Sequence, residues 1–304
     1  MKRDLLELLD IKESELFRLL GRTAELKRAG KGNAARRPLS GKSIGLIFEK
    51  RSTRTRLSFE VGIAQMGGQP IFMSPDQMQL SRGEPVKDTA RVLSRYLDGV
   101  VIRNDSHDDL REFARWSTVP VINALTNLYH PCQVFSDLFT IKEAGGNLAK
   151  MKLAFVGDPN NIFNSWMNAA AMIGFHLTLA SPKGYGPDRE ALKCAQKRGE
   201  VRMQTYKDPA EAVKGADVIY TDVWVSMGQE KNSAKKRNDF AGFTIDRKLL
   251  KAAAPNALVL HCLPAHRGEE ITDEVMENFA DLIFTQAENR LHGQKALMEF
   301  FFKK

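Results

Sequence analysis

Cysteine is scarce in this 304-residue chain, and the three that occur, Cys132, Cys194 and Cys262, lie far apart. An odd number of scattered cysteines indicates no disulfide framework and fits a reducing compartment best. No apolar run approaches the roughly 20 residues of a membrane span. The leucines near the start are interrupted by Glu7, unlike the apolar core of a signal peptide. We therefore expect a soluble, cytoplasmic protein.

Blocks of positive charge are also missing, although the chain is basic overall. The net charge is +8 and the pI is near 9.3, yet the densest basic clusters are only Arg36-Arg37 and Lys235-Lys236-Arg237. No aromatic residues are interleaved with them, as binding of single-stranded nucleic acid would require. Nucleic acid and membrane surfaces are therefore disfavoured as partners, and small anionic substrates explain the charge better.

The motifs for nucleotide cofactors and for metal ions are incomplete. Asp158-Pro159-Asn160-Asn161 follows the strand expected at 153–156, but it lacks the Gly-x-Gly-x-x-Gly spacing that a dinucleotide requires. His261-Cys262 is compatible with a thiol nucleophile or a metal site, or with a backbone that Pro264 holds extended to orient an amide. No second pair of metal ligands occurs at useful spacing. We expect neither a cofactor nor a metal ion.

Short apolar strands alternate with helical segments along the whole chain, which predicts an α/β protein with parallel sheets. The length suits two domains. We expect each to have a central parallel sheet flanked by helices, with interdomain helices joining the two. The expected domains are 1–133 plus 286–304, and 134–285. The expected strands are 43–48, 71–73, 99–103, 119–124, 153–156, 177–180, 218–221, 257–260 and 282–284. Helices are expected near 12–29, 86–97, 134–144, 162–173 and 290–302.

The run Ser52-Thr53-Arg54-Thr55-Arg56 lies between the strand at 43–48 and a helix expected to begin near Ser52. The start of a helix offers unpaired N–H groups and the positive end of the dipole, which together favour an anion. The hydroxyls add donors, and Arg54 adds a planar fork suited to phosphate oxygens. The alternative is a capped basic helix at the surface. We interpret the run as a phosphate-binding turn.

Further polar residues follow other expected strands, at the ends where open α/β sheets bind ligands. They are Arg103, Asn161, Asp222 and His261-Cys262. Taken alone, Arg103 could be a solvated loop residue. His130, three residues before Gln133, could equally have a structural role. The clustering at strand ends nevertheless favours a ligand site.

Two polar loops are long enough to be functional. The first covers residues 74–85 and contains Gln79. The second begins at Asp222-Val223-Trp224-Val225-Ser226-Met227-Gly228 and continues through polar residues to 238. Its composition suggests a mobile loop with an apolar tip, and the alternative is a surface loop with one buried Trp. We expect this loop to act as a lid.

Four motifs together resemble one enzyme family. The run at 52–56 and His130-Pro131-x-Gln133 are similar to the aspartate and ornithine carbamoyltransferases in general. Asp222-x-Trp224-x-Ser226-Met227-Gly228 and His261-Cys262-Leu263-Pro264 resemble the ornithine branch. The motifs occur in the family's order and span essentially the whole chain. Val223 stands where Thr is common and Ser81 where Gly is common, and neither departure removes an expected ligand.

The resemblance implies an enzyme of arginine biosynthesis that transfers the carbamoyl group of carbamoyl phosphate to the side-chain amine of L-ornithine, giving L-citrulline. The first domain would bind carbamoyl phosphate and the second ornithine. The residues implied for carbamoyl phosphate are Ser52, Thr53, Arg54, Thr55, Gln79, Arg103, His130, Gln133, Cys262, Leu263 and Arg290. Those implied in catalysis are Thr55, Arg103, His130 and Cys262. Those implied for ornithine are Asn161, Asp222, Ser226 and Met227.

The resemblance also implies a homotrimer, or a multiple of trimers, in which a neighbouring subunit supplies Gln79. Two alternatives stay open. The accepted amine could be putrescine or an N-acylated ornithine, although putrescine lacks the α-carboxylate and α-amine that the polar residues of the second domain suit. A basic nucleic-acid-binding protein without enzymatic activity is the alternative from another class.

Overall fold

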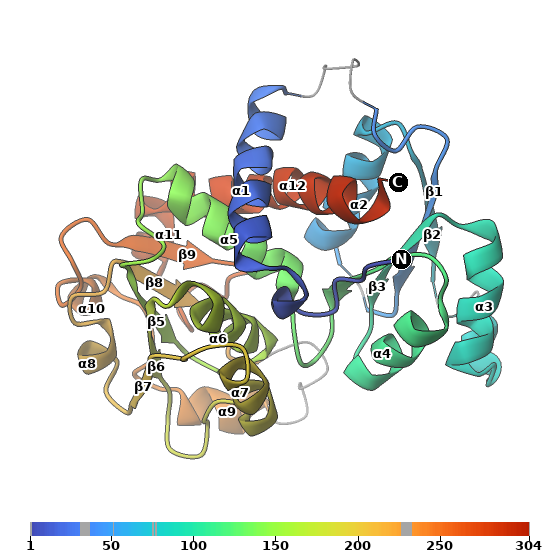
Figure 1. Ribbon diagram of the computed structural model, residues 1–304. Coiled ribbons are helices and arrows are strands. Elements are labelled where there is room, and N and C mark those ends of the chain that lie inside the picture. Colours follow the sequence, from blue (N-terminus) through green and yellow to red (C-terminus); the bar gives the residue numbers. More distant parts are fainter. Residues whose placement is uncertain are drawn as a thin grey trace. The chain divides into compact units, whose positions relative to one another are not determined.

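The computed structural model describes residues 2–30, 37–50, 52–74, 76, 78–225 and 233–303, without the side chains of residues 81 and 82. It divides into unit 1, Met1–Phe139 with Asn289–Lys304, and unit 2, Thr140–Glu288. Helix α5 (Pro131–Glu143) begins in unit 1 and ends in unit 2, and α12 (Ala280–Phe302) runs from unit 2 into unit 1. Two parallel-sheet domains joined by helices confirm the predicted fold class (Figure 1). We propose that the first domain comprises residues 1–133 and 286–304, and that the second domain comprises residues 134–285.

Unit 1 is built on a parallel sheet with the strand order β2-β1-β3-β4. Its strands are β1 (Ser43–Phe48), β2 (Gln69–Met73), β3 (Gly99–Arg103) and β4 (Val121–Leu125). Leu5 adds an isolated parallel bridge to Ile122 in β4. The helices that lie wholly in this unit are α1 (Glu13–Arg28), α2 (Arg54–Gln65), α3 (Val86–Tyr96) and α4 (His107–Trp116), with short 3-10 turns η1 (Leu8–Asp10) and η3 (Gln79–Arg82).

Unit 2 is built on a parallel sheet with the order β7-β6-β5-β8-β9. Its strands are β5 (Lys152–Val156), β6 (His176–Ala180), β7 (Met203–Tyr206), β8 (Val218–Thr221) and β9 (Leu258–His261). The helices that lie wholly in this unit are α6 (Asn161–Ile173), α7 (Arg189–Gln196), α8 (Pro209–Val213), α9 (Ser233–Asp239), α10 (Arg247–Leu250) and α11 (Asp273–Asn278).

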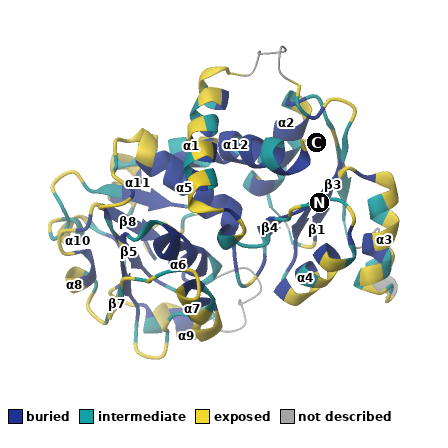
Figure 2. Ribbon diagram, in the orientation of Figure 1, coloured by how far each residue is buried: buried dark blue, intermediate teal, exposed yellow. Residues whose placement is uncertain are grey.

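The central strands are buried on both faces, as the dark strands of Figure 2 show. Such strands have continuous apolar runs because helices cover both sides of a parallel sheet, and this is why the sequence predicted β1, β3 and β8 with their observed limits. Unit 1 holds 26 of the 45 Lys and Arg residues and 18 of the 37 acidic residues, so it carries the whole net charge of +8. In the part of the chain that the structure describes, no helix is long and apolar enough to cross a bilayer.

The strand predicted at 282–284 is wrong, because these residues belong to α12. A run of three apolar residues does not distinguish a strand from a helix. The burial pattern does: Ile283, Gln286 and Arg290 are buried at helical spacing, whereas Phe284 is 56% exposed. Strand β7 escaped prediction because it lies at the edge of its sheet and its short sequence, Met-Gln-Thr-Tyr, is only partly buried.

Both sheets contain a point at which the strand order reverses, and ligands of open α/β sheets bind beside such points. In unit 1 the reversal lies between β1 and β3, since the chain leaves β1 toward β2 and then returns to β3. In unit 2 it lies between β5 and β8. Several polar residues that the sequence singled out lie beside these reversal points: Ser52, Thr53 and Asp222 in the loops after β1 and β8, Arg103 at the end of β3, and Asn161 at the start of α6 after β5.

Candidate active site

The loops after β1 and β3 meet at the reversal point of unit 1. Arg103 is the last residue of β3, and its Nη1 donates to Ser52 Oγ at 3.4 Å. The backbone N–H of Glu49 bonds the carbonyl oxygen of Arg103 at 2.9 Å and fixes the start of the turn. The side chain of Thr53, the N-cap residue of α2, makes no capping hydrogen bond. The helix therefore presents its N-terminal N–H groups beside the Arg103 guanidinium, an arrangement suited to an anion.

A second guanidinium links three helices of unit 1. Arg290, on α12, donates through Nη2 to Thr55 Oγ1 on α2 at 3.0 Å and through Nη1 to Gln133 Oε1 on α5. Gln133 Nε2 in turn donates to Asp137 Oδ1 at 2.9 Å. All four side chains are buried. The structure thus brings together Thr55, Gln133 and Arg290, which lie far apart in the sequence.

Burial and the neighbouring cations together shift the pKa values of the groups in this cluster. Burial, followed by the charges of Arg290 and Arg54, lowers the pKa of Arg103 to about 10. His130 is held between the end of β4 and the start of α5, and burial, followed by Arg290 and Arg103, lowers its pKa well below the usual value. His130 is therefore neutral at pH 7. Burying several cations together costs free energy of folding unless a bound anion compensates their charge.

The remaining predicted residues of unit 1 are more open to solvent. Arg54 is half-buried and lies close enough to Arg103 to lower its pKa. Thr53 precedes α2 and is exposed. Gln79 begins η3, and its exposed side chain joins none of the hydrogen bonds described above. Arg103 and Arg290 thus form a buried cationic cluster, whereas Thr53 and Arg54 are more exposed to solvent.

In unit 2 the loops after β5 and β8 are joined by side chains. Asp222 follows β8, and its Oδ2 accepts from Asn160 Nδ2 at 2.6 Å. Asn160 also caps α6, because its Oδ1 accepts from the N–H of Ile162 at 2.9 Å. Asn161 is the first residue of α6. A carboxylate and an amide side chain are thereby fixed at the reversal point of this sheet, where a cationic ligand would be favoured.

The turn after β9 is held by a buried histidine. His261 Nδ1 accepts from the N–H of Leu263 at 2.9 Å, and its Nε2 lies 3.0 Å from Glu270 Oε1. Because Nδ1 accepts, the Nε2–H donates to the Glu270 carboxylate. Glu270 Oε1 also accepts from the N–H of His266. This arrangement supports Leu263 at a φ of +58°, a conformation that non-glycine residues rarely adopt.

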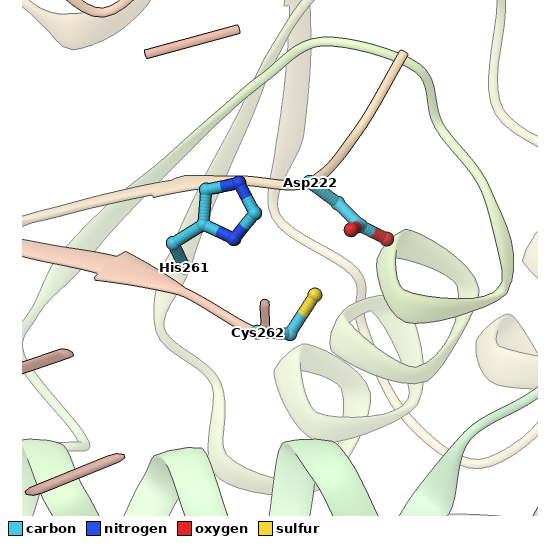
Figure 3. Close-up of side chains that lie close together, drawn as sticks. All are labelled: Asp222, His261 and Cys262. Carbon is cyan, nitrogen blue, oxygen red and sulfur yellow. The ribbon is translucent and has the colours of Figure 1, made fainter. Parts of the chain in front are cut away.

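Asp222, His261 and Cys262 lie close together at the ends of β8 and β9 (Figure 3). One potential ligand atom from each residue lies within 4.8 Å of the others, so Asp222 adds a candidate metal ligand that the sequence spacing did not reveal. Both nitrogens of His261 are nevertheless engaged, with the Leu263 N–H and with Glu270. A metal ion would have to replace one of these bonds. The geometry favours a role of this histidine in fixing the turn.

Two predicted ornithine ligands, Ser226 and Met227, lie outside the described residues. Sequence reasoning in turn missed Asn160 and Glu270. Asn160 could have been found from the preference of Asn for the N-cap position before a helix. The contact between Glu270 and His261 had no local signal, because it depends on how the loop after β9 folds back.

Comparison with known proteins matches the whole chain to one family. Residues 3–143 match the model for the carbamoyl-P binding domain of aspartate/ornithine carbamoyltransferases, and residues 149–301 match the model for the Asp/Orn binding domain. A protein of Methanoculleus marisnigri named ornithine carbamoyltransferase is 52% identical over 298 residues, covering 98% of this chain and 96% of the relative. One of the same name from Geobacter sulfurreducens is 51% identical and covers 100% of both chains.

Solved structures agree with this match. The anabolic ornithine carbamoyltransferase of Campylobacter jejuni superposes with a TM-score of 0.93 at 45% identity, covering 99% of both chains. The ornithine carbamoyltransferase of Pyrococcus furiosus gives a TM-score of 0.90 at 44% identity, with 97% of this chain and 96% of that chain covered. The similarity therefore extends over both units.

Proposed function

This chain belongs to the aspartate/ornithine carbamoyltransferase family, and from that membership we propose that it transfers the carbamoyl group of carbamoyl phosphate to the side-chain amine of L-ornithine. The products are L-citrulline and phosphate. The observation that carries the proposal is the buried cluster of Arg103 and Arg290 with the hydroxyl of Thr55 and the start of α2. This is the charge and donor pattern that a phosphorylated carbonyl compound requires.

The residues of unit 1 would hold carbamoyl phosphate and stabilise its reacting atoms. Ser52, Thr53, Arg54 and Thr55 bind the phosphate group at the start of α2. Arg103 bridges phosphate and carbonyl oxygen, and with Thr55 and His130 it stabilises the oxyanion of the tetrahedral species. Gln133 and Arg290 contact the carbamoyl group and keep one another in place. Carbamoyl phosphate is already activated, so the chemistry requires no protein nucleophile and no cofactor.

The residues of unit 2 would hold ornithine and its attacking amine. Asn161, Asp222, Ser226 and Met227 bind the amino acid, and Cys262 and the Leu263 carbonyl orient the groups that react. The neutral amine forms the N–C bond to the carbonyl carbon, phosphate departs with the electron pair of the broken C–O bond, and the amine releases a proton. An alkyl ammonium titrates near ~10.4 in water, and desolvation beside Arg side chains would lower that pKa.

We expect Cys262 to orient substrates without forming a covalent intermediate. Cys262→Ser should retain turnover with kcat reduced about tenfold, the size of one neutral hydrogen bond. Cys194→Ser, on α7, is the control and should leave kcat unchanged. Intact-mass spectrometry of the wild type quenched during turnover should find no carbamoylated protein. A carbamoyl adduct on Cys262, together with an inactive Cys262→Ser, would refute this role.

We further propose a homotrimer or a multiple of trimers, in which Gln79 serves a neighbouring subunit's site. Unit 1 exposes the apolar side chains of Leu57 (51%), Val61 (40%) and Ile71 (37%), on α2 and β2, and such side chains are typical of subunit interfaces. Analytical ultracentrifugation should give a mass of three 34.1 kDa chains or a multiple of three. Leu57→Asp should lower that mass, whereas Phe284→Asp, an exposed position of unit 2, should not. A monomeric wild type would contradict the proposal.

The biological setting follows from the same relationship. We propose a cytoplasmic enzyme that works in the biosynthetic direction of arginine metabolism. The anabolic name of the Campylobacter jejuni structure supports the direction. Citrulline formation at physiological phosphate, faster than its phosphorolysis, is the expected kinetic result.

The decisive test is citrulline formation from carbamoyl phosphate with ornithine, run beside putrescine, N-acetylornithine and aspartate. Ornithine should be strongly preferred, and Arg54→Ala should abolish turnover with it. Preference for another amine would keep the role proposed for unit 1 and reject that of unit 2. No turnover with any amine would reject the enzymatic proposal. Binding of DNA or RNA that weakens steeply with salt would favour the nucleic-acid alternative.

A further inference from the structure

We propose that the buried ion pair between Asp158 and Lys236 is a positioning device for Asp222, and thereby for the amino acid that unit 2 binds. The inference rests on the proposed function, and it assigns a role to two residues that contribute no ligand atom to the substrates. The two residues are 78 positions apart in the sequence and come from the turn after β5 and from α9.

The ion pair is connected to the Asp222 carboxylate through Asn160. Lys236 Nζ donates to Asp158 Oδ2 at 2.8 Å, and the two side chains are only 10% and 12% exposed. The carbonyl oxygen of Asp158 accepts from the N–H of Asn160 at 2.8 Å. Asn160 then donates to Asp222 Oδ2 at 2.6 Å. A shift of Asp158 is therefore transmitted through Asn160 to Asp222.

Charge gives the pair a second effect on Asp222. Burial raises the pKa of Asp158, Lys236 lowers it, and the nearby Asp222 raises it again. The pKa of Asp158 is raised overall, and Lys236 opposes this rise and so favours the ionised form beside a second carboxylate. With both carboxylates ionised, the three side chains carry one net negative charge. That charge matches one ammonium group of an amino acid. Without Lys236, two carboxylates would face each other, and Asp158 would have to move or take up a proton.

Helix α9 and the residue after it have further contacts besides the Lys236 pair. Tyr185 Oη donates to Asp239 Oδ2 at 2.8 Å, and the Tyr185 ring packs against Phe240 with centroids 4.7 Å apart. Trp224 stacks on the same Phe240 ring at 5.8 Å. Lys236 Nζ also lies 6.0 Å from the Tyr185 ring. Replacing Lys236 should therefore leave these contacts of α9 in place and remove the link to Asp158.

The test compares Lys236→Met, Lys236→Arg and the double variant Asp158→Asn/Lys236→Met, with the exposed neighbour Lys235→Met as the matched control. We expect Lys236→Met to raise KM for ornithine about tenfold or more, with KM for carbamoyl phosphate within about twofold, since tenfold corresponds to one misplaced polar contact. Lys236→Arg should restore KM. The double variant should have a KM for ornithine between those of Lys236→Met and the wild type, because it no longer leaves the Asp158 carboxylate buried and unpaired. Lys235→Met should match the wild type.

Three results would overturn the inference. These are an unchanged KM for ornithine in Lys236→Met, an equal rise in both KM values, or a double variant that is worse than Lys236→Met. Wild-type protein that makes no citrulline would instead reject the proposed function. A crystal structure of Lys236→Met tests the inference without an assay. The bond between Asn160 Nδ2 and Asp222 Oδ2 should be broken or lengthened, and an unchanged bond would reject the positioning role.

Discussion

Arg103→Met is expected to lower kcat for carbamoyl transfer by about 10²–10³-fold, the ~2.7–4 kcal/mol that one oxyanion-hole donor typically provides. Arg103 is the buried cation at the end of β3, and it donates to Ser52 beside the start of α2. Methionine keeps much of the side-chain volume and removes the charge. Steady-state kinetics with ornithine would measure the loss, and KM for carbamoyl phosphate should rise as well.

The same substitution should make the unliganded protein more stable. Arg103 is 5% exposed, its Nε has no hydrogen-bond partner among the described residues, and Arg290 and Arg54 repel its charge. Removing this buried charge, which Asp105 compensates only in part, relieves the repulsion. The melting temperature without ligand should rise, by ~2–4 °C for each kcal/mol gained. Inorganic phosphate should stabilise the wild type, by ~2.7 kcal/mol at 100 times its Kd, and should not stabilise the variant.

Arg111→Met is the matched control for Arg103. Arg111 lies on α4 and pairs with Asp108 three residues away, with 41% of its side chain exposed. Such a surface pair contributes ~0–1 kcal/mol, so kcat and the effect of phosphate should stay at wild-type values. A normal kcat in Arg103→Met would contradict the oxyanion role, and a lower melting temperature would show that the charge is already compensated without ligand.

The sequence located much of this site because the signals at strand ends are local. Strands β1, β3 and β8 are buried on both faces, and the polar residues that the site uses lie close to their ends: Ser52 four residues after β1, Arg103 as the last residue of β3, and Asp222 directly after β8. The hydroxyl-rich turn at Ser52 follows the same logic, since a strand-to-helix turn needs donors only where an anion binds. The helical pattern at 290–302 placed Arg290 on a helix, and Asn161 was expected in the turn just before the helix that it begins in the structure. The four motifs of the family were needed to assign the roles of both residues.

The contacts that support the site could not be predicted because they join distant segments. Arg290 meets Thr55 and Gln133 only once α12 packs on α2 and α5. Glu270 reaches His261 because the chain folds back after Pro264, and no spacing rule describes that return. Lys236 gave a pattern typical of a solvated basic cluster, and only tertiary packing buries it against Asp158. Side-chain pairing across such distances is a property of packing and not of local sequence.

Glu270→Ala should strongly destabilise unit 2. Glu270 is fully buried, and its Oε1 accepts from His261 Nε2 and from the N–H of His266. Each buried donor left without an acceptor costs ~1–3 kcal/mol. The free energy of unfolding, measured by urea denaturation, should therefore fall by several kcal/mol. Glu274→Ala is the control, because Glu274 forms an exposed pair with Arg247 and should change stability by ~0–1 kcal/mol.

Activity should fall in Glu270→Ala beyond what unfolding explains. Leu263 is held at a φ of +58° by its N–H bond to His261, and a non-glycine residue in this region costs ~1–3 kcal/mol. His261 without Glu270 is free to turn, so Leu263 relaxes and its carbonyl leaves the position proposed for the carbamoyl amide. At a temperature where the variant is folded, kcat should drop, and Glu270→Gln, which keeps one oxygen acceptor, should recover part of it. Wild-type kcat in a folded Glu270→Ala would show that the strained turn is not required for transfer.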